Sequence, residues 1–292
     1  MKRTTTTIIA TALSAVLATG TLAGCGSQQA APSEEPAATE ATTEATTEAA
    51  TEQTTEELVA EFKEAAAKAP TYQSVTITAE ETTTLTGEDA NSDENITSKT
   101  VYKFDNSGDQ LKTSADAEIA DVKMTYYTDG DAAVLVTDEG VYSGTVEQFE
   151  LNFADGVEAF LKESVGSADV FADCAAEVEK TETNGLTFYT LTLDPQKYTA
   201  SDESLQMLAD YGSPIEEALV TIGFEEDGSL ASLDRKLTYP QSTFVKNMSF
   251  SVYNATVVDP MPEATKTFEE MGSDIETKLG EFEENLGAEA TE

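Results

Sequence analysis

Residues 122–143 read VKMTYYTDGDAAVLVTDEGVYS, three short runs rich in apolar and aromatic residues that are separated by two polar turns. The runs are Val122–Thr128, Ala132–Val136 and Val141–Ser143, and the turns are Thr128-Asp129-Gly130-Asp131 and Asp138-Glu139-Gly140. Glycine beside an acidic residue is the chemistry of tight hairpin turns. The stretch therefore predicts three antiparallel strands in sequence.

The same pattern extends in both directions along the chain. Upstream, side chains that would share one face of a strand recur every two residues, which predicts two strands, at Val75, Ile77 and Ala79 and at Ile96, Ser98, Thr100, Tyr102 and Phe104. A further strand is expected from Leu111 to Ile119. Downstream, Glu177–Thr181 and Leu186–Leu193 flank Asn184-Gly185, a strong hairpin signal. The last set pairs Ala218–Phe224 with Leu230–Tyr239 across Glu226-Asp227-Gly228, then adds Phe244–Val258. We expect one antiparallel meander that ends at Asp259-Pro260-Met261-Pro262.

Helical periods occur at four places. Thr54-Thr55-Glu56-Glu57 is a capping box ahead of Leu58, Val59 and Phe62, and Pro70 ends that helix. A middle helix presents Val146, Phe149, Phe153, Val157, Phe160 and Leu161 on one face, and a short helix is expected from Ser201 to Tyr211. Phe268, Met271, Ile275, Leu279, Phe282 and Leu286 predict an amphipathic helix in residues 264–292, which end in an acidic tail.

The beginning of the chain has the layout of a secretory signal. Lys2 and Arg3 precede a mostly apolar run, Ile8–Ala18, which is shorter than the roughly 20 residues of a transmembrane helix. The run ends in Leu22-Ala23-Gly24-Cys25, which looks like a bacterial lipobox. This resemblance implies cleavage after residue 24 and a lipid anchor of at least two acyl chains, palmitate-type, on Cys25, enough for stable attachment to a membrane.

The composition of the sequence divides the chain after residue 24 into three segments. Residues 25–55 are rich in Thr, Glu and Ala and contain no aromatic side chain, which predicts a disordered tether. Whether the threonines of this tether are glycosylated stays open. We expect residues 1–24 to be the signal peptide, 56–263 a single β-rich domain, and 264–292 the helix and tail.

Charge and missing residue types exclude several functions. The formal net charge is −40, and removal of residues 1–24 would bring it to −42, so DNA and RNA are not expected partners. The chain contains no histidine, which excludes Ser/His/Asp, Cys/His and zinc–histidine sites. Cys174 would be the one cysteine left without lipid, and we expect it to be a small buried or half-buried side chain rather than a nucleophile. No catalytic residue, metal site or cofactor is predicted.

The order of a first helix, a long meander interrupted by a helix, and a closing strand that runs into Pro-x-Pro resembles the LolA/LolB-like fold. The chain is also similar to LppX/LprG-type lipoproteins and to uncharacterised lipoproteins of Gram-positive bacteria. The resemblance rests on Tyr126-Tyr127-Thr128-Asp129-Gly130-Asp131, Val141-Tyr142-Ser143-Gly144, Phe188-Tyr189-Thr190-Leu191-Thr192-Leu193 and the segment Phe250–Pro262. It implies an α+β, mainly β fold: a curved antiparallel half-barrel around an apolar cavity covered by helices.

This fold implies a non-catalytic carrier or sensor of a lipid or other apolar ligand. Under that reading, Phe62, Phe149, Phe153, Phe160 and Leu161 are the expected cavity-lining residues, although such a stripe also fits ordinary core packing. The alternative is a module that binds a cell-envelope protein through its acidic surface and has no small ligand. In either case we expect attachment to the outer face of the cell membrane, most simply that of a Gram-positive cell.

Overall fold

The structure is a computed structural model that describes residues 53–68, 72–85, 95–119, 122–164 and 167–273. The predicted signal peptide, the lipobox with Cys25 and the tether up to residue 52 lie outside the described residues. Pro70 and residues 274–292, which hold most of the predicted C-terminal helix and the acidic tail, also lie outside them.

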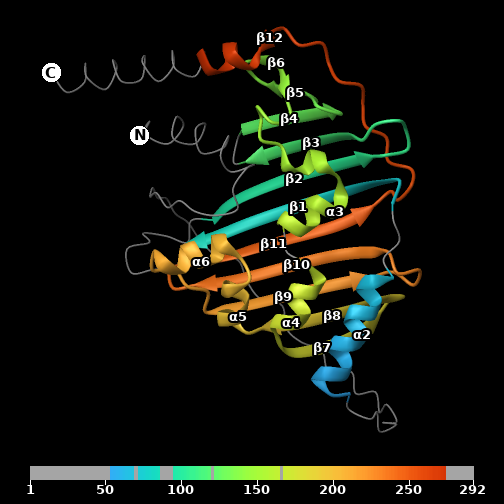
Figure 1. Cartoon of the computed structure of the whole chain (residues 1–292), viewed down its shortest axis with the longest axis vertical. Coiled ribbons are helices and arrows are strands. Elements are labelled where there is room, and N and C mark those ends of the chain that lie inside the picture. The colour runs from blue at the N-terminus through green and yellow to red at the C-terminus, as the bar shows by residue number, and fades with distance from the viewer. Residues whose placement is uncertain (1–52, 69–71, 86–94, 120–121, 165–166, 274–292) are drawn as a thin grey trace, which may run out of the picture.

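The described residues form one 12-stranded sheet that is curved and unclosed (Figure 1). Its strands are β1 Ser74–Leu85, β2 Asn95–Asp105, β3 Lys112–Ile119, β4 Val122–Asp129, β5 Ala132–Thr137, β6 Gly140–Thr145, β7 Ala175–Thr183, β8 Leu186–Leu193, β9 Glu217–Phe224, β10 Leu230–Tyr239, β11 Ser242–Ser251 and β12 Lys266–Thr267. Two antiparallel meanders, β1 to β6 and β7 to β11, meet where β1 pairs with β11. The mainly β fold class and the antiparallel turns around residues 122–143 are confirmed.

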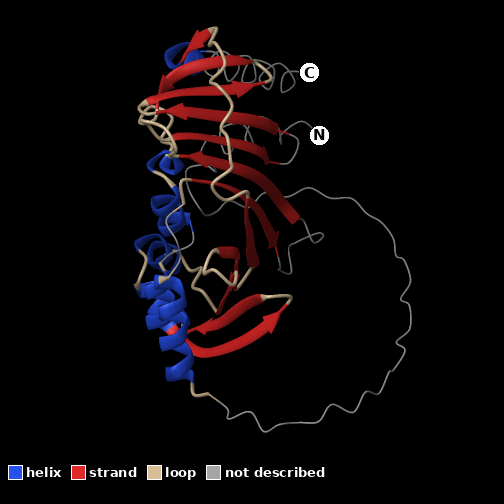
Figure 2. Ribbon diagram, turned by 90° about the vertical axis from the view of Figure 1, so that its right-hand side faces the viewer, coloured by secondary structure: helices blue, strands red, loops and turns tan. Residues whose placement is uncertain are grey.

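Helices lie along one face of this sheet, which we call the helix face (Figure 2). They are α2 Thr55–Ala67, the 3-10 turn η1 Asn152–Asp155, α3 Val157–Ser164, α4 Ala168–Cys174, α5 Pro195–Ala200 and α6 Glu203–Asp210. The capping box is confirmed: the Glu57 amide donates to the Thr54 hydroxyl, and the Thr54 amide donates to the Glu57 carboxylate.

The period of two in the sequence separates the helix face from the opposite, outer face. Val75, Ile77 and Ala79 of β1 are buried, at 0%, 0% and 3% exposure, and they point toward the helices. Register carries this face across the sheet, because Ile77 lies opposite Phe250 of β11 on one side and Tyr102 of β2 on the other. Burial of the apolar residues on this face is the main term that stabilises the domain.

The helical passages differ from the sequence prediction. The expected single middle helix is interrupted, because Glu150 has a φ of 51° and Gly156 a φ of 101°, neither compatible with a continuous right-handed helix. A turn, η1 and α3 therefore replace one helix. The expected helix Ser201–Tyr211 is present as α6, whereas α4 and α5 were not predicted.

The end of the sheet also needs correction. The predicted strand Phe244–Val258 ends at Ser251, since Val252 and Asn254 have φ angles of 55° and 56° and turn the chain away. The sheet does not end at Pro262 either, and the expected purely antiparallel sheet is a mixed one. The chain crosses to the far edge, where β12 pairs in parallel with β6.

Beyond β12, residues 268–273 are helical. The Phe268 ring packs on the Phe149 ring at 5.1 Å between centroids, and Met271 is buried at 6% exposure. Within the described part of the chain, no helix has the length and apolar character needed to cross a membrane.

Candidate functional site

The aromatic residues that the sequence suggested lie in two groups of ring contacts within one hydrophobic core. The first, which we call the β2–β4 cluster, contains Phe153 and Phe160 beside Tyr102, Phe104 and Tyr126. Phe153 lies 5.7 Å from Tyr102 and 6.4 Å from Tyr126, and Phe160 lies 4.4 Å from Tyr102, between ring centroids. Burial raises the pKa of the Tyr126 hydroxyl to about 12.

Phe149 extends this cluster toward the β6 edge, with its ring 6.2 Å from that of Tyr126. Phe149, Phe153 and Phe160 are all almost fully buried, at 5%, 1% and 3% exposure. Leu161, the next residue on α3, is only partly buried and packs against the same core. The structure thus brings three of the five suggested residues, Phe149, Phe153 and Phe160, into one group of ring contacts, and Leu161 follows directly after Phe160 on α3.

Phe62 lies elsewhere, in what we call the α2 cluster. Its ring is 5.6 Å from Tyr189 of β8 and 6.5 Å from Phe224 of β9. Phe62 is completely buried, at 0% exposure. In the order of strands, β1, β11 and β10 lie between this cluster and the β2–β4 cluster, so the Phe62 ring does not join the ring contacts of Phe149, Phe153 and Phe160.

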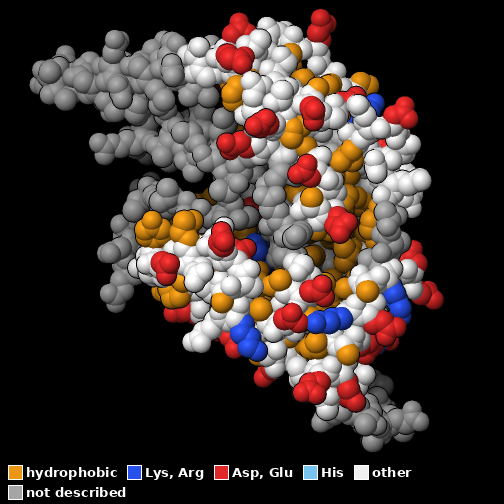
Figure 3. Space-filling view, viewed as in Figure 1, with side chains coloured by type: hydrophobic (Ala, Val, Ile, Leu, Met, Phe, Trp, Pro, Cys, Tyr) orange, Lys and Arg blue, Asp and Glu red, His pale blue; other side chains and the backbone are white. Residues whose placement is uncertain are grey.

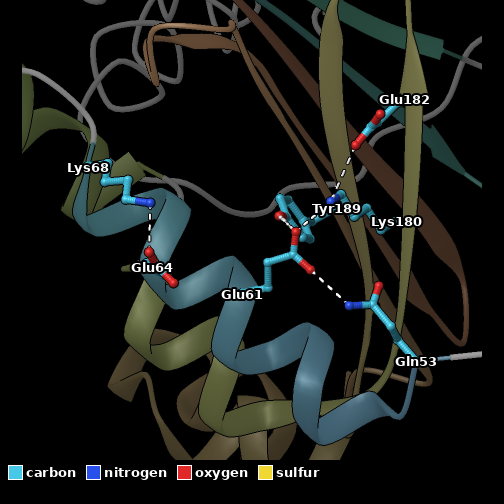
Figure 4. A network of polar contacts seen from close by, with 7 residues as sticks. All are labelled: Gln53, Glu61, Glu64, Lys68, Lys180, Glu182 and Tyr189. Atoms are coloured by element: carbon cyan, nitrogen blue, oxygen red, sulfur yellow. Dashed lines mark hydrogen bonds and ion pairs between the residues drawn. The ribbon is translucent and has the colours of Figure 1, made fainter.

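A polar network holds α2 over its cluster (Figure 4). Glu61 accepts hydrogen bonds from Lys180 of β7 at 2.5 Å and from the Tyr189 hydroxyl at 3.1 Å. Gln53 also donates to Glu61, and Lys180 forms a second ion pair with Glu182. The hydrogen bond from Lys180 lowers the pKa of Glu61, while burial raises the pKa of Tyr189 to about 12. These contacts fix α2 to the β7–β8 end of the sheet.

The helices approach the sheet closely in two places. α2, α4 and α5 lie against β7, β8 and β9, and η1 lies against β3. Between these groups, Figure 3 shows apolar side chains gathered in a hollow below α3 and above α2, over the region of β1 and β11 in Figure 1. Val157 and Leu161 of α3 are partly buried and pack against the hydrophobic core of the domain.

Charged residues occupy the helix face on the central strands, which the sequence analysis did not identify. Glu81 of β1 lies opposite Lys246 of β11, and Lys246 lies opposite Arg235 of β10. The Glu81 carboxylate pairs with the Lys246 ammonium at 2.9 Å and accepts a bond from the Ser98 hydroxyl of β2 at 3.4 Å. We call Arg235, Lys246, Glu81 and Ser98 the polar row.

The sequence carried a signal for this row. The alternation that places Val75, Ile77 and Ala79 inside also places Glu81 on the same face, two residues further along β1. A charged residue at an inward position of a strand is the anomaly that points to a buried partner. Which residue is that partner follows only from the strand register.

Two other features carry less functional meaning. Cys174 is buried at 4% exposure, as expected, and burial raises the pKa of its thiol, which makes it a poor nucleophile. A depression of about 70 Å³, lined in part by Leu219, Thr221 and Val245, lies on the outer face. It is far smaller than the roughly 300–1,000 Å³ of ligand pockets.

No protein-family model and no curated protein sequence match the chain. Among solved structures, the chain is similar to the lipoprotein LppX of Mycobacterium tuberculosis, with 15% identity, a TM-score of 0.41, and coverage of 69% of this chain and 97% of that one. It is also similar to LprF of Mycobacterium bovis, with 12% identity, a TM-score of 0.40, and coverage of 72% and 96%.

A LolA superfamily protein of Nitrosomonas europaea is a third match, with 10% identity, a TM-score of 0.26, and coverage of 70% and 97%. At these identities and TM-scores the likeness says nothing about function. The curved, unclosed sheet with helices along one face has the half-barrel form that the sequence resemblance implied.

Proposed function

We propose that the chain binds a lipid or other apolar molecule without catalysing a reaction, and holds it against the helix face between α3 and α2. The observation that carries this proposal is the apolar hollow between the two helix groups (Figure 3). Apolar surface that is open to water is unfavourable by roughly 25 cal/mol per Å², so an apolar occupant would stabilise the domain.

The helices that cover the sheet are short enough to move aside for an apolar ligand. α3, α4, α5 and α6 are 8, 7, 6 and 8 residues long. Helices this short are marginal on their own and depend on packing against the sheet. A shift of α3 away from the central strands would widen the hollow while the strand pairing stays intact.

Attachment through Cys25 is the second part of the proposal. An acylated Cys25 followed by a tether of about 30 residues, with a root-mean-square reach of roughly 30 Å, would keep the domain near the outer surface of the cell membrane. A carrier or sensor in that position would have direct access to membrane lipids, and its acidic surface would keep it from lying flat on anionic head groups.

Mass spectrometry of an organic extract tests this function. The full chain with Cys25→Ser, which carries no covalent lipid, should co-purify with about one lipid or apolar molecule per protein. An unrelated acidic protein from the same host is the control. An extract that stays clean after native-host lipids are offered would contradict the proposal.

A pair of variants tests where the ligand binds. Leu161→Asp on α3 should abolish co-purification, because the charge enters the apolar hollow. Met207→Asp on α6, where Met207 is 55% exposed, should leave it unchanged. Both variants should still unfold cooperatively.

The net charge of −40 favours one alternative, a protein-interaction module. Figure 3 shows many more acidic than basic side chains on the visible face. In this case the chain would bind a cationic envelope protein, and binding would weaken steeply between low and physiological salt. A clean lipid extract together with salt-sensitive protein binding would favour this module over the carrier.

A further inference from the structure

We propose that the open edge of β7 binds a basic, extended peptide segment of a partner protein, which adds a strand to the sheet. This inference goes beyond the proposed function, because β8, β9 and β10 separate β7 from the hollow over β1 and β11. Binding at this edge needs no lipid in the hollow.

The two edges of the sheet differ. At one edge, the chain itself covers β6: β12 pairs with it in parallel, and the Thr265 amide donates to the Val141 carbonyl at 2.9 Å. The other edge is β7, at the lower end of the sheet in Figure 1, which pairs with β8 alone. Within the described part of the chain, no strand lies on the second side of β7.

The β7–β8 hairpin determines which backbone groups of β7 face the open side. Its loop is Asn184-Gly185, with φ angles of 53° and 80°, so the flanking residues Thr183 and Leu186 form the first hydrogen-bonded pair. Such pairs recur every second residue, and the residues between them direct their amides and carbonyls away from β8. Among the hydrogen bonds of the described residues, none satisfies these groups, so they offer donors and acceptors to an incoming strand. The residues with outward backbone groups are Val178, Lys180 and Glu182.

The side chains along this edge are mostly acidic. Glu177, Glu179 and Glu182 are exposed, and Lys180 is the only basic residue of β7. The Lys180 ammonium is already paired with Glu61 at 2.5 Å and with Glu182 at 3.3 Å. Glu177 and Glu179 form no ion pair with any residue that the structure describes. Their two carboxylates are therefore available to a cationic partner.

The geometry of an added strand specifies where its basic residues lie. On the open side, Glu177 and Glu179 are at non-hydrogen-bonded positions, since Val178 between them carries the outward backbone groups. Opposite side chains come closest at such positions, with Cα atoms about 4.5 Å apart in an antiparallel pair. A lysine or arginine opposite each glutamate would form a cross-strand ion pair, and the residue between them would lie beside Val178, which is 7% exposed. The matching sequence is therefore basic-apolar-basic.

β7 is held in its extended form before a partner binds. The Lys180 ammonium joins the Glu61 carboxylate of α2, and Glu61 also accepts from the Tyr189 hydroxyl of β8 (Figure 4). Every residue of β7 from Glu177 to Thr183 has a register partner on β8. A strand that is already ordered loses little conformational entropy on binding, which favours affinity.

The charges of β7 select against other occupants. A second copy of the chain would bring the same excess of glutamates to the seam, and like charges opposite each other destabilise a sheet. Charges on an edge strand, an inward charge such as Lys180, and the bulge between Ala175 and Glu177 all protect the edge from uncontrolled pairing. A basic strand is the partner for which this repulsion becomes attraction.

The test measures binding of a capped octapeptide of alternating lysine and valine to the full chain with Cys25→Ser, by calorimetry at low salt. The peptide should bind, and binding should weaken steeply toward physiological salt. The double variant Glu177→Gln/Glu179→Gln should weaken binding by roughly three- to tenfold, the range for two exposed ion pairs. The same peptide N-methylated at its valines keeps its charge but cannot pair along the edge, so it should not bind.

Matched control variants come from strands that are paired on both sides. Glu80→Gln on β1 and Glu217→Gln on β9 replace exposed glutamates of such strands and should leave peptide affinity unchanged. Glu182→Pro removes an outward amide of β7, at the kind of edge position where proline is tolerated, and should weaken binding more than Glu182→Ala. Thermal unfolding of every variant separates a loss of binding from a loss of fold.

The outcomes are distinct. Equally tight binding of the N-methylated peptide, or an equal loss of affinity in Glu80→Gln and in the β7 double variant, would show general attraction to the acidic surface and overturn the inference. Self-association of the chain that Glu182→Pro abolishes would show that the edge holds a second copy, and this too would overturn it. The lipid content of the organic extract should be the same in all variants, so the proposed function is tested separately.

Discussion

Replacement of Phe153 by alanine tests how the β2–β4 cluster is packed. Phe153 is 1% exposed, and its ring contacts those of Tyr102 and Tyr126. Removal of a buried phenylalanine ring costs roughly 3–5 kcal/mol, from lost burial and from the cavity that remains. Because a domain is typically stable by roughly 5–15 kcal/mol, Phe153→Ala should remove about a fifth or more of the free energy of unfolding.

Urea unfolding followed by circular dichroism measures this loss directly, as a lower midpoint with an unchanged slope. Phe153→Leu should recover most of the loss, because it restores much of the volume. Val257→Ala, at a side chain that is 70% exposed, should change stability by less than about 0.5 kcal/mol. A loss below about 1 kcal/mol for Phe153→Ala would refute this reasoning, since it would show that the ring borders an open cavity rather than a packed core.

Three further effects follow from local geometry. Thr54→Ala should lower stability by about 1 kcal/mol in the same urea assay, because the capping box of α2 loses its hydroxyl; an unchanged midpoint would contradict the role of this cap. Gly144→Ala should be destabilising by about 1–3 kcal/mol, since a Cβ there would come within 2.7 Å of the Phe149 ring, whereas Gly108→Ala should be neutral, since its Cβ would meet only the Gln110 carbonyl oxygen at 4.0 Å. Burial raises the pKa of Tyr126 from its ordinary value of 10 to about 12, so the folded state holds the hydroxyl proton more tightly than the unfolded state does. The stability that the protonated hydroxyl contributes is therefore present below pH 10 and is lost as the pH rises toward 12. Ultraviolet absorbance of tyrosinate against pH checks this point, and ionisation of all tyrosines near pH 10 in the folded protein would contradict it.

Local signals in the sequence were sufficient for much of the fold. Asn184 and Gly185 adopt φ angles of 53° and 80°, the turn geometry that an Asn-Gly pair between two strands indicates. The alternation at Val75, Ile77 and Ala79 identified the inward face of β1, because period-two burial is a property of the strand itself.

Elements that depend on distant contacts were not predictable in this way. Val252 has a φ of 55°, an outlier for a β-branched residue, so nothing local indicates that β11 ends at Ser251. The pairing of β12 with β6 joins residues more than 120 positions apart, and two residues carry no periodic signal.

Only the part of the site that is built from neighbouring residues could be predicted from the sequence. Phe149, Phe153 and Phe160 lie close together in the sequence and pack on one cluster, whereas the position of Phe62 depends on which end of the sheet α2 covers. The polar row joins residues of four strands, and only Glu81 could be identified from its own strand. The separation of these residues along the chain hides the row until the register is known.

Photo-crosslinking with a diazirine-bearing fatty acid tests the central claim most directly. The label reacts with whatever surrounds the acyl chain, and peptide mass spectrometry then locates it on the protein. We predict labels on α3 and on the helix face of β1 and β11, near Leu161, Ala79 and Met248, and their loss in Leu161→Asp. Labels confined to the outer face around Leu219 and Val245, or no label above that on an unrelated acidic protein, would contradict the claim.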